Sequence, residues 1–168
     1  MNRTIFFLAK GFKFLFLPRY ITPMHTPALS FTFSKHEHLS KKKEIDFLFS
    51  SGKSFSKFPF RVMYDVKHEA KKIPVRMAVS VPKKKIKRAV DRNRIKRLTR
   101  EGYRLNKQLL TEVCKNKNAA IDFMLIYTGN VNPEFITVQS KIVLILQRLN
   151  SIIQQGNAPS DDSLTKVL

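Results

Sequence analysis

The chain of 168 residues has a single cysteine, Cys114, and only 12 acidic residues. One cysteine excludes an internal disulfide and a metal site built from several cysteines, and it fits a reducing compartment. We expect Cys114 to be a small buried residue. The scarcity of carboxylates argues against a protein nuclease with its own two-metal site, because such a site needs several acidic ligands close together.

Other catalytic and metal-binding patterns are also missing. The sequence has no paired-histidine zinc helix and no nucleophile elbow. Gly52 begins a Gly-Lys-Ser sequence, but the glycine that a nucleotide-binding loop needs five positions earlier is Phe47 here. His36 and His38 have no further candidate ligands, which favours a solvated turn over a metal site. We therefore predict no catalytic residues and no metal site in this chain.

Positive charge is present in large excess. The 32 Lys and Arg residues give a formal net charge of +20 and a pI near 10.4. Such a domain repels itself, and a polyanionic partner that releases its counterions on binding offsets this repulsion. Nucleic acid and an anionic membrane surface are the candidate partners, and a solvated surface without a partner is the alternative.

The first 30 residues differ from the rest of the chain, with four basic residues and no acid. The apolar run at residues 4–17 is shorter than the roughly 20 residues of a membrane-spanning helix, and Lys10 and Lys13 interrupt it. The same lysines disfavour a secretory signal. We interpret residues 1–30 as an extension outside the fold. An organellar targeting segment and a start codon assigned too early, with Met24 as the true start, are the alternatives.

Hydrophobic periodicity predicts one domain at residues 31–153, followed by a polar tail at residues 154–168. The expected order is helix, strand, strand, a long basic helix, strand and helix. The first helix is expected over residues 39–49, and the first two strands over residues 58–66 and 75–81. The long basic helix is expected from after Pro82 to about residue 115. The third strand is expected over residues 121–127 and the last helix over residues 135–149. The pattern predicts a small α+β sandwich of sheet and helices.

The run at residues 83–104 contains eleven Lys and Arg residues among twenty-two. Within it, an apolar stripe with spacings of three and four predicts a helix docked on the core through Ile95, Leu98, Gly102, Leu105 and Leu109. At about 100° per residue, one group of side chains points away from that stripe: Arg92, Lys96, Arg100 and Tyr103. Asn93, Arg97 and Arg104 project beside them. Arg, Lys and Asn side chains suit phosphate recognition, so this helix is the candidate surface for a polyanion.

The positive charge continues upstream into the preceding loop, at Lys83, Lys84, Lys85, Lys87 and Arg88. Charge that lies opposite an apolar stripe and continues into a loop is less typical of a merely solvated face. Some aromatic residues could stack on unpaired bases, although such residues more often belong to the core: Phe49, Phe60, Tyr64 and Tyr103.

Residues 89–101, AVDRNRIKRLTRE, are similar to the protein subunit of bacterial ribonuclease P. Residues 78–84, AVSVPKK, resemble that family's strand and lysine pair, and residues 33–49 with Gly52 resemble its first helix and turn. The resemblance covers roughly residues 31–152. It implies a two-layer α+β sandwich with a central, mostly antiparallel sheet and a left-handed β-α-β crossover, similar to domain 2 of ribosomal protein S5.

The resemblance also implies a function. Proteins of this family bind a large catalytic RNA and help it remove the 5′ leader from precursor tRNA, while the RNA carries the chemistry with Mg²⁺. The implied partners are ribonuclease P RNA and precursor tRNA, in a minimal holoenzyme of one protein and one RNA. The implied location is the bacterial cytoplasm, with no membrane contact.

The predicted site residues fall into two groups. The group expected to contact the catalytic RNA is Arg92, Asn93, Arg94, Arg97, Lys83 and Lys84. The group expected to contact the leader of precursor tRNA is Lys96, Arg100, Phe49, Tyr64 and Phe60. Ile45 stands where the family usually has another aromatic, so we expect weaker stacking on the leader. A general RNA-binding protein and a membrane-surface protein that uses its N-terminal Phe and Lys residues remain as alternatives.

Overall fold

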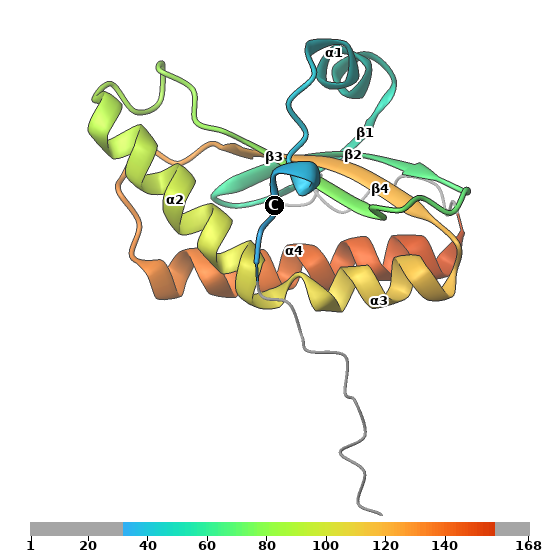
Figure 1. Ribbon diagram of the computed structural model, residues 1–168. Helices are drawn as coiled ribbons and strands as arrows, with labels where there is room; N and C mark the ends of the chain where they lie inside the picture. The colour runs from blue at the N-terminus through green and yellow to red at the C-terminus, as the bar shows by residue number, and fades with distance from the viewer. Residues whose placement is uncertain (1–31, 157–168) are drawn as a thin grey trace, which may run out of the picture. The chain divides into compact units, whose positions relative to one another are not determined.

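The computed structural model describes residues 32–156, which form a four-stranded sheet packed by helices (Figure 1). The predicted extension at residues 1–30 and most of the predicted tail, residues 157–168, lie outside the described residues. The elements, in chain order, are η1 (Lys35–Glu37), α1 (Lys42–Ser51), β1 (Lys53–Lys57), β2 (Phe60–Lys67), β3 (Val75–Ser80), α2 (Ala89–Asn106), α3 (Gln108–Asn116), β4 (Ala120–Tyr127) and α4 (Phe135–Gln155).

The sheet has the strand order β1-β2-β4-β3. β1 and β2 are antiparallel, as are β2 and β4, whereas β3 and β4 are parallel. Parallel neighbours need a crossover connection, and here the chain leaves β3, passes through α2 and α3, and returns as β4. The predicted α+β class with a mostly antiparallel sheet is confirmed.

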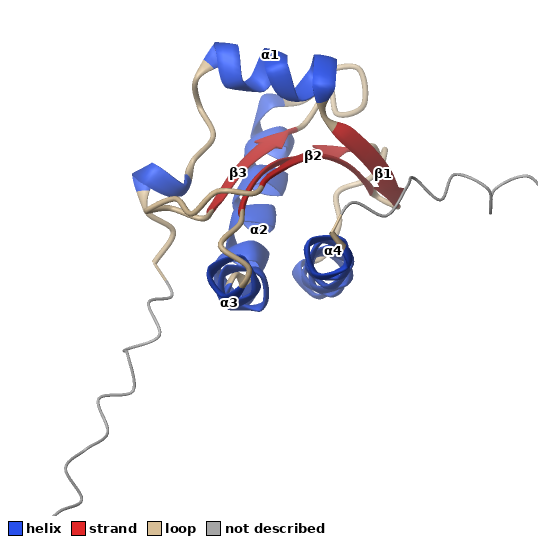
Figure 2. Ribbon diagram, turned by 90° about the vertical axis from the view of Figure 1, so that its right-hand side faces the viewer, coloured by secondary structure: helices blue, strands red, loops and turns tan. Residues whose placement is uncertain are grey.

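The helices are distributed unequally over the two faces of the sheet (Figure 2). α3 and α4 pack side by side under one face, and α2 runs obliquely from the end of β3 toward α3 (Figure 1). α1 lies across the opposite face. The larger helical layer and the sheet form the predicted sandwich, and α1 adds a partial layer on the other side.

The strand residues alternate between two hydrophobic clusters, as the two-residue period of a strand requires. In β2, Phe60, Val62 and Tyr64 point into the larger core beneath the sheet, whereas Met63 points to the opposite face and packs with Leu48 of α1. Each fully buried large apolar side chain contributes roughly 1.5–3 kcal/mol. The larger core therefore supplies most of the stabilisation, and the smaller cluster fixes α1 on the sheet.

The hydrophobic pattern of the sequence did not predict β1. Its residues are Lys-Ser-Phe-Ser-Lys, and of these only Phe55 is partly buried. A short polar strand at the edge of a sheet carries no strong alternation of apolar residues, so periodicity does not reveal it. The strand expected at residues 58–66 begins at Phe60, because Phe58 and Pro59 form the turn between β1 and β2.

The long basic helix that the sequence predicts is two helices in the structure. α2 ends at Asn106 and α3 begins at Gln108. Between them, the Lys107 amine is buried and donates hydrogen bonds to Thr32 O (2.5 Å) and Glu37 Oε1 (2.8 Å). The break in the helix therefore also ties down the segment that precedes α1.

α4 contains 21 residues and ends at Gln155, two residues beyond the predicted domain boundary at residue 153. Gly156 follows with a φ of +53°, a left-handed conformation that glycine adopts at a helix end without strain. Within residues 32–156, no helix is both long enough and apolar enough to cross a membrane.

Candidate nucleic-acid interface

One face of α2 anchors it to the core. Its buried residues are Ile95, Thr99, Gly102 and Tyr103. The Tyr103 ring packs edge-on against Phe33 and Phe123, with ring centroids 5.3 and 5.8 Å away. A Cβ at Gly102 would lie 2.8 Å from Ile142 Cδ1, so the glycine lets α4 approach closely.

The buried face of α2 is rotated from the predicted apolar stripe. Tyr103, which we expected to point outward, is 1% exposed, whereas Leu105 and Leu109 are 36% and 41% exposed. The prediction is wrong for these three residues, because the buried stripe of α2 runs through Ile95, Thr99, Gly102 and Tyr103, about one position away from the predicted stripe. The large tyrosine ring fills the space beside the sheet, and Leu109 belongs to α3 because α2 ends at Asn106.

The face of α2 that points away from the core is cationic. Asn93, Arg94 and Arg97 are exposed, and none of their side chains makes a hydrogen bond or ion pair with another residue of the described part of the chain. Arg104, further along α2, pairs with Glu101 through hydrogen bonds of 2.6 and 2.8 Å. The first half of α2 therefore presents two forked guanidinium groups and an amide that are available to a ligand.

Arg92 supports the loop before α2. Its Nη1 donates hydrogen bonds to Ile86 O (3.1 Å) and Lys87 O (2.5 Å). Ile86 is buried in the core, so the loop is held at this point, while Lys83 and Lys84 are exposed in the turn before it. Part of the Arg92 guanidinium therefore positions the basic loop beside α2, a role that the sequence analysis did not predict.

Lys96 and Arg100 lie four residues apart on one flank of α2, and both are partly exposed. Burial lowers the pKa of His38, and the charge of the nearby Arg100 guanidinium lowers it further. His38 bridges to Met77 at the edge of β3. The flank with Lys96 and Arg100 therefore turns toward β3 and the segment before α1, rather than toward the side on which Arg94 and Arg97 lie.

Only one of the three aromatic residues predicted to contact the leader is accessible. Phe49 on α1 is 52% exposed. Phe60 is 1% exposed and packs against Tyr127, and Tyr64 is 9% exposed and packs against Phe55. Phe60 and Tyr64 point from β2 into the larger core, so their rings are not open to a base. The structure corrects the prediction that these two residues stack on RNA.

Phe47 is an accessible aromatic residue that the sequence analysis did not consider for binding. It is 50% exposed, whereas the neighbouring Leu48 is 1% exposed and packs on the sheet. Since each helical step turns about 100°, Phe47 and Phe49 project from opposite flanks of α1. The sequence signal for this arrangement is a Phe-Leu-Phe run in which the central leucine is buried. This signal could have indicated that Phe47 and Phe49 are both exposed.

A network of charged residues ties α1 to the sheet. From β3, Arg76 donates to Asp122 of β4 through Nε and Nη2 (both 2.7 Å) and to Glu44 of α1 through Nη1 (2.9 Å). Lys67 donates to the same aspartate at 2.9 Å. Burial alone would raise the pKa of Asp122, but the hydrogen bonds from Arg76 and Lys67 outweigh it and lower the pKa. The network fixes the orientation of α1.

The fold and the cationic side of α2 define a basic α+β protein with an unpaired helix face that is suited to nucleic acid. Within residues 32–156, no group of three or more His, Cys, Asp or Glu side chains is arranged to hold a metal ion.

Residues 33–150 match the family model described as Ribonuclease P. The chain is 42% identical over 139 residues to the ribonuclease P protein component of Porphyromonas gingivalis strain ATCC 33277, covering 82% of this chain and 96% of that protein. It is 45% identical over 85 residues to the ribonuclease P protein component of Chlorobium phaeobacteroides, covering 48% of this chain and 57% of that protein.

The fold is also similar to solved structures of ribonuclease P proteins. The Staphylococcus aureus protein aligns with a TM-score of 0.53 at 23% identity, over 67% of this chain and 94% of that one. The Thermotoga maritima protein aligns with a TM-score of 0.52 at 24% identity, over 66% of this chain and 96% of that one. The chain belongs to the ribonuclease P protein component family, as its sequence resemblance predicted, and is a protein subunit of ribonuclease P.

Proposed function

We propose that this protein binds ribonuclease P RNA and the 5′ leader of precursor tRNA, and thereby assists endonucleolytic removal of the leader. The family relationship supports partnership with the RNA. In this proposal one protein acts with one RNA, and the RNA carries the chemistry with Mg²⁺. The protein supplies affinity and discrimination, and none of its side chains takes part in bond cleavage.

The observation that carries the proposal is the unpaired outer face of α2. Asn93, Arg94 and Arg97 have no protein partner among residues 32–156, although the opposite side of the same helix is buried. Lys83 and Lys84 extend this surface into the loop that Arg92 holds in place, as described above. A rigid helix with several unpaired cations is suited to the closely spaced phosphates of a folded RNA.

The leader would bind along the other flank of α2. Lys96 and Arg100 would neutralise its phosphates, and Phe49 would stack on an unpaired base. Mature tRNA lacks the leader, so these contacts would favour the precursor over the product. Lysine and arginine beside the joint between the two RNAs would also reduce phosphate repulsion and lower the Mg²⁺ concentration needed for activity.

Cleavage of a precursor tRNA at low Mg²⁺ tests the function. Three samples are compared: the protein alone, a matching ribonuclease P RNA alone, and the two together. We expect cleavage at the mature 5′ end only in the mixture. Cleavage by the protein alone would contradict the proposed division of roles, and no stimulation by the protein would favour a general RNA-binding protein.

Two substitutions on one helix separate the two proposed surfaces. Arg97→Ala should weaken assembly with the catalytic RNA. It should also reduce the slope of log binding constant against log salt concentration by about one, as loss of one phosphate contact does. Arg100→Ala should weaken binding of precursor tRNA to the assembled holoenzyme while leaving mature tRNA binding nearly unchanged. An equal loss for precursor and mature tRNA in the Arg100 variant would argue against leader contact.

A further inference from the structure

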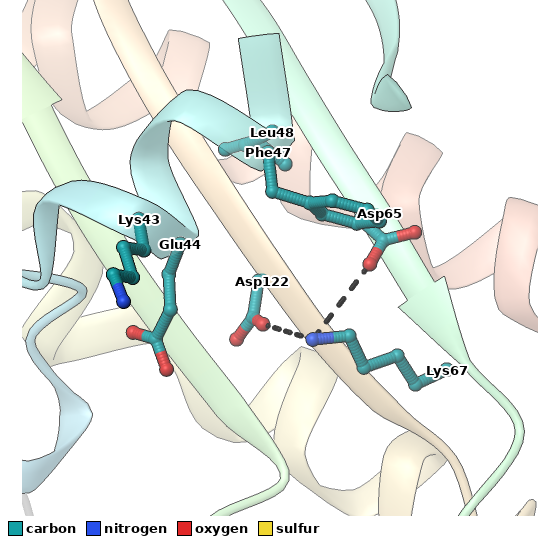
Figure 3. Close-up of a pocket in the computed structure, with 7 residues that line it drawn as sticks. All are labelled: Lys43, Glu44, Phe47, Leu48, Asp65, Lys67 and Asp122. Carbon is teal, nitrogen blue, oxygen red and sulfur yellow. Dashed lines mark hydrogen bonds and ion pairs between the residues drawn. The ribbon is translucent and has the colours of Figure 1, made fainter. Parts of the chain in front are cut away.

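A cavity of about 310 Å³ lies beside α1, on the flank that carries Phe47 (Figure 3). Phe47 and Leu48 of α1 line it from one side, and Asp65 and Lys67 of β2 line it from the other, with Asp122 of β4 behind. The volume is at the lower end of the range for small-molecule sites, which starts at about 300 Å³. Figure 3 shows the Phe47 ring extending toward the Asp65 carboxylate. The cavity is therefore bounded by a half-exposed aromatic ring and a polar floor.

The polar floor has unused hydrogen-bond acceptors. Both oxygens of Asp122 accept hydrogen bonds from Arg76 or Lys67. Asp65 is held only by an ion pair of 3.8 Å between its Oδ2 and Lys67 Nζ, and Glu44 accepts from Arg76 through Oε1. Asp65 Oδ1 and Glu44 Oε2 accept no hydrogen bond from any residue between 32 and 156. A ligand in this cavity would meet a flat apolar ring and two carboxylate oxygens that can accept hydrogen bonds from it.

A second cavity adjoins the first and is cationic. It has a volume of about 560 Å³ and shares Glu44 and Lys67 with the first cavity. Lys35, Lys41 and Lys72 also line it, and none of the three forms an ion pair within residues 32–156. This pair of cavities combines an aromatic surface, hydrogen-bond acceptors and neighbouring cations.

We propose that the two cavities bind one unpaired RNA nucleotide whose base carries an amino group. The base stacks on Phe47 and donates hydrogen bonds from its amino edge to Asp65 or Glu44, and the phosphate lies among the lysines of the second cavity. Guanine, which presents adjacent ring N–H and amino donors, fits the carboxylates better than uracil, whose single ring N–H lies between two carbonyl oxygens. The site rests on the proposed RNA-binding function. Phe47 projects from the flank of α1 opposite Phe49, whereas the second cavity extends to His38, near the Arg100 side of α2.

Titration of the isotope-labelled full chain with guanosine 5′-monophosphate or uridine 5′-monophosphate, followed by NMR, tests the site. We expect saturable shifts of the Phe47 and Asp65 amide signals with the guanosine nucleotide, and affinity at least about fivefold weaker for the uridine nucleotide. Phe47→Leu keeps an apolar residue of good helix propensity at position 47. It removes the aromatic ring, so it should weaken guanosine nucleotide binding at least about fivefold. Asp65→Asn should reduce the preference for guanosine over uridine.

The matched control is Phe49→Leu, which removes an equally exposed ring from the opposite flank of α1 and should leave the shifts at Asp65 unchanged. Equal affinity for the two nucleotides would overturn the proposal, because it would mean that only the phosphate is bound. Equal losses in the Phe47 and Phe49 variants would also overturn it. Stimulation of precursor cleavage by the unmodified protein is measured separately, so absent shifts with intact stimulation reject this site alone, whereas absent stimulation rejects the proposed function.

Discussion

Arg76→Met should strongly destabilise the fold, because it removes the centre of the charged network between α1 and the sheet. Arg76 joins three elements through hydrogen bonds of 2.7, 2.7 and 2.9 Å to Asp122 and Glu44. Its side chain is 20% exposed, and that of Asp122 is 11% exposed. Methionine has a similar length and is apolar, so the substitution removes the interactions without leaving a large cavity.

The size of the effect follows from the carboxylate that is left behind. Breaking a buried ion pair by removing one partner costs about 3–5 kcal/mol, because the other charge remains desolvated. Asp122 keeps its hydrogen bond from Lys67 at 2.9 Å, and neither Asp122 nor Arg76 is completely buried. We therefore expect a loss at the lower end, about 3 kcal/mol in the free energy of unfolding at pH 7.

The effect should depend on pH in a defined direction. The pKa of Asp122 is lowered in the folded protein, so its stabilising contribution is complete above its unfolded pKa of about 3.9 and is lost as the pH falls through the folded pKa. Without Arg76, burial acts on Asp122 with less opposition, and its folded pKa should rise. Protonation of Asp122 then removes the unpaired charge from the interior of the variant. The difference in free energy of unfolding between the variant and the unmodified protein should therefore shrink as the pH falls from 7 toward 4.

Urea denaturation at several pH values measures this difference. Arg104→Met is the matched control, because Arg104 pairs with Glu101 on the surface of α2 and exposed pairs contribute little. We expect the control to lose much less stability than the Arg76 variant. A loss at Arg76 no larger than that of the control, or a loss that stays constant from pH 7 to 4, would refute the reasoning.

Three smaller predictions concern packing. Gly52→Ala should destabilise the protein in urea denaturation, because its Cβ would collide with the carbonyl oxygen of Leu48. Gly102→Ala should cost about 1 kcal/mol by the same measurement, because crowding of Ile142 at 2.8 Å, roughly 1–3 kcal/mol, is partly offset by the better helix propensity of alanine. Cys114 is fully buried and burial raises its pKa to about 11, so a thiol reagent at pH 8 should modify it only after denaturant is added.

Much of the fold could be predicted because its elements have strong hydrophobic patterns. The apolar run at residues 121–127 is β4, and the helical pattern after Pro133 is α4. β1 could not be predicted, because Phe55 is the only apolar residue in it. The pairing of β3 with β4 across a helical connection was available only through the family resemblance, since periodicity identifies strands but not their neighbours.

Among the candidate site residues, exposure was predicted best for the charged side chains. A helical wheel assigns residues to faces with an uncertainty of about one position. This uncertainty is enough to predict Tyr103 as exposed and Leu105 as buried, when the reverse is true. The prediction is more reliable for charged side chains than for apolar ones, because Arg94 and Arg97 cannot be buried without partners. Aromatic residues lack this constraint: the same ring suits a core or a base, and so Phe60 and Tyr64 were assigned incorrectly.

The contacts that hold the basic surface in place were invisible in the sequence for a different reason. Arg92 lies within the cationic run, and nothing in its spacing distinguishes it from Arg97. It differs because the chain turns back before α2 and brings the carbonyl oxygens of Ile86 and Lys87 within reach of its guanidinium. Arg92→Ala should therefore weaken RNA assembly indirectly, by loosening the loop with Lys83 and Lys84. Increased amide exchange in that loop of the free protein would distinguish this indirect effect from the loss of a direct phosphate contact.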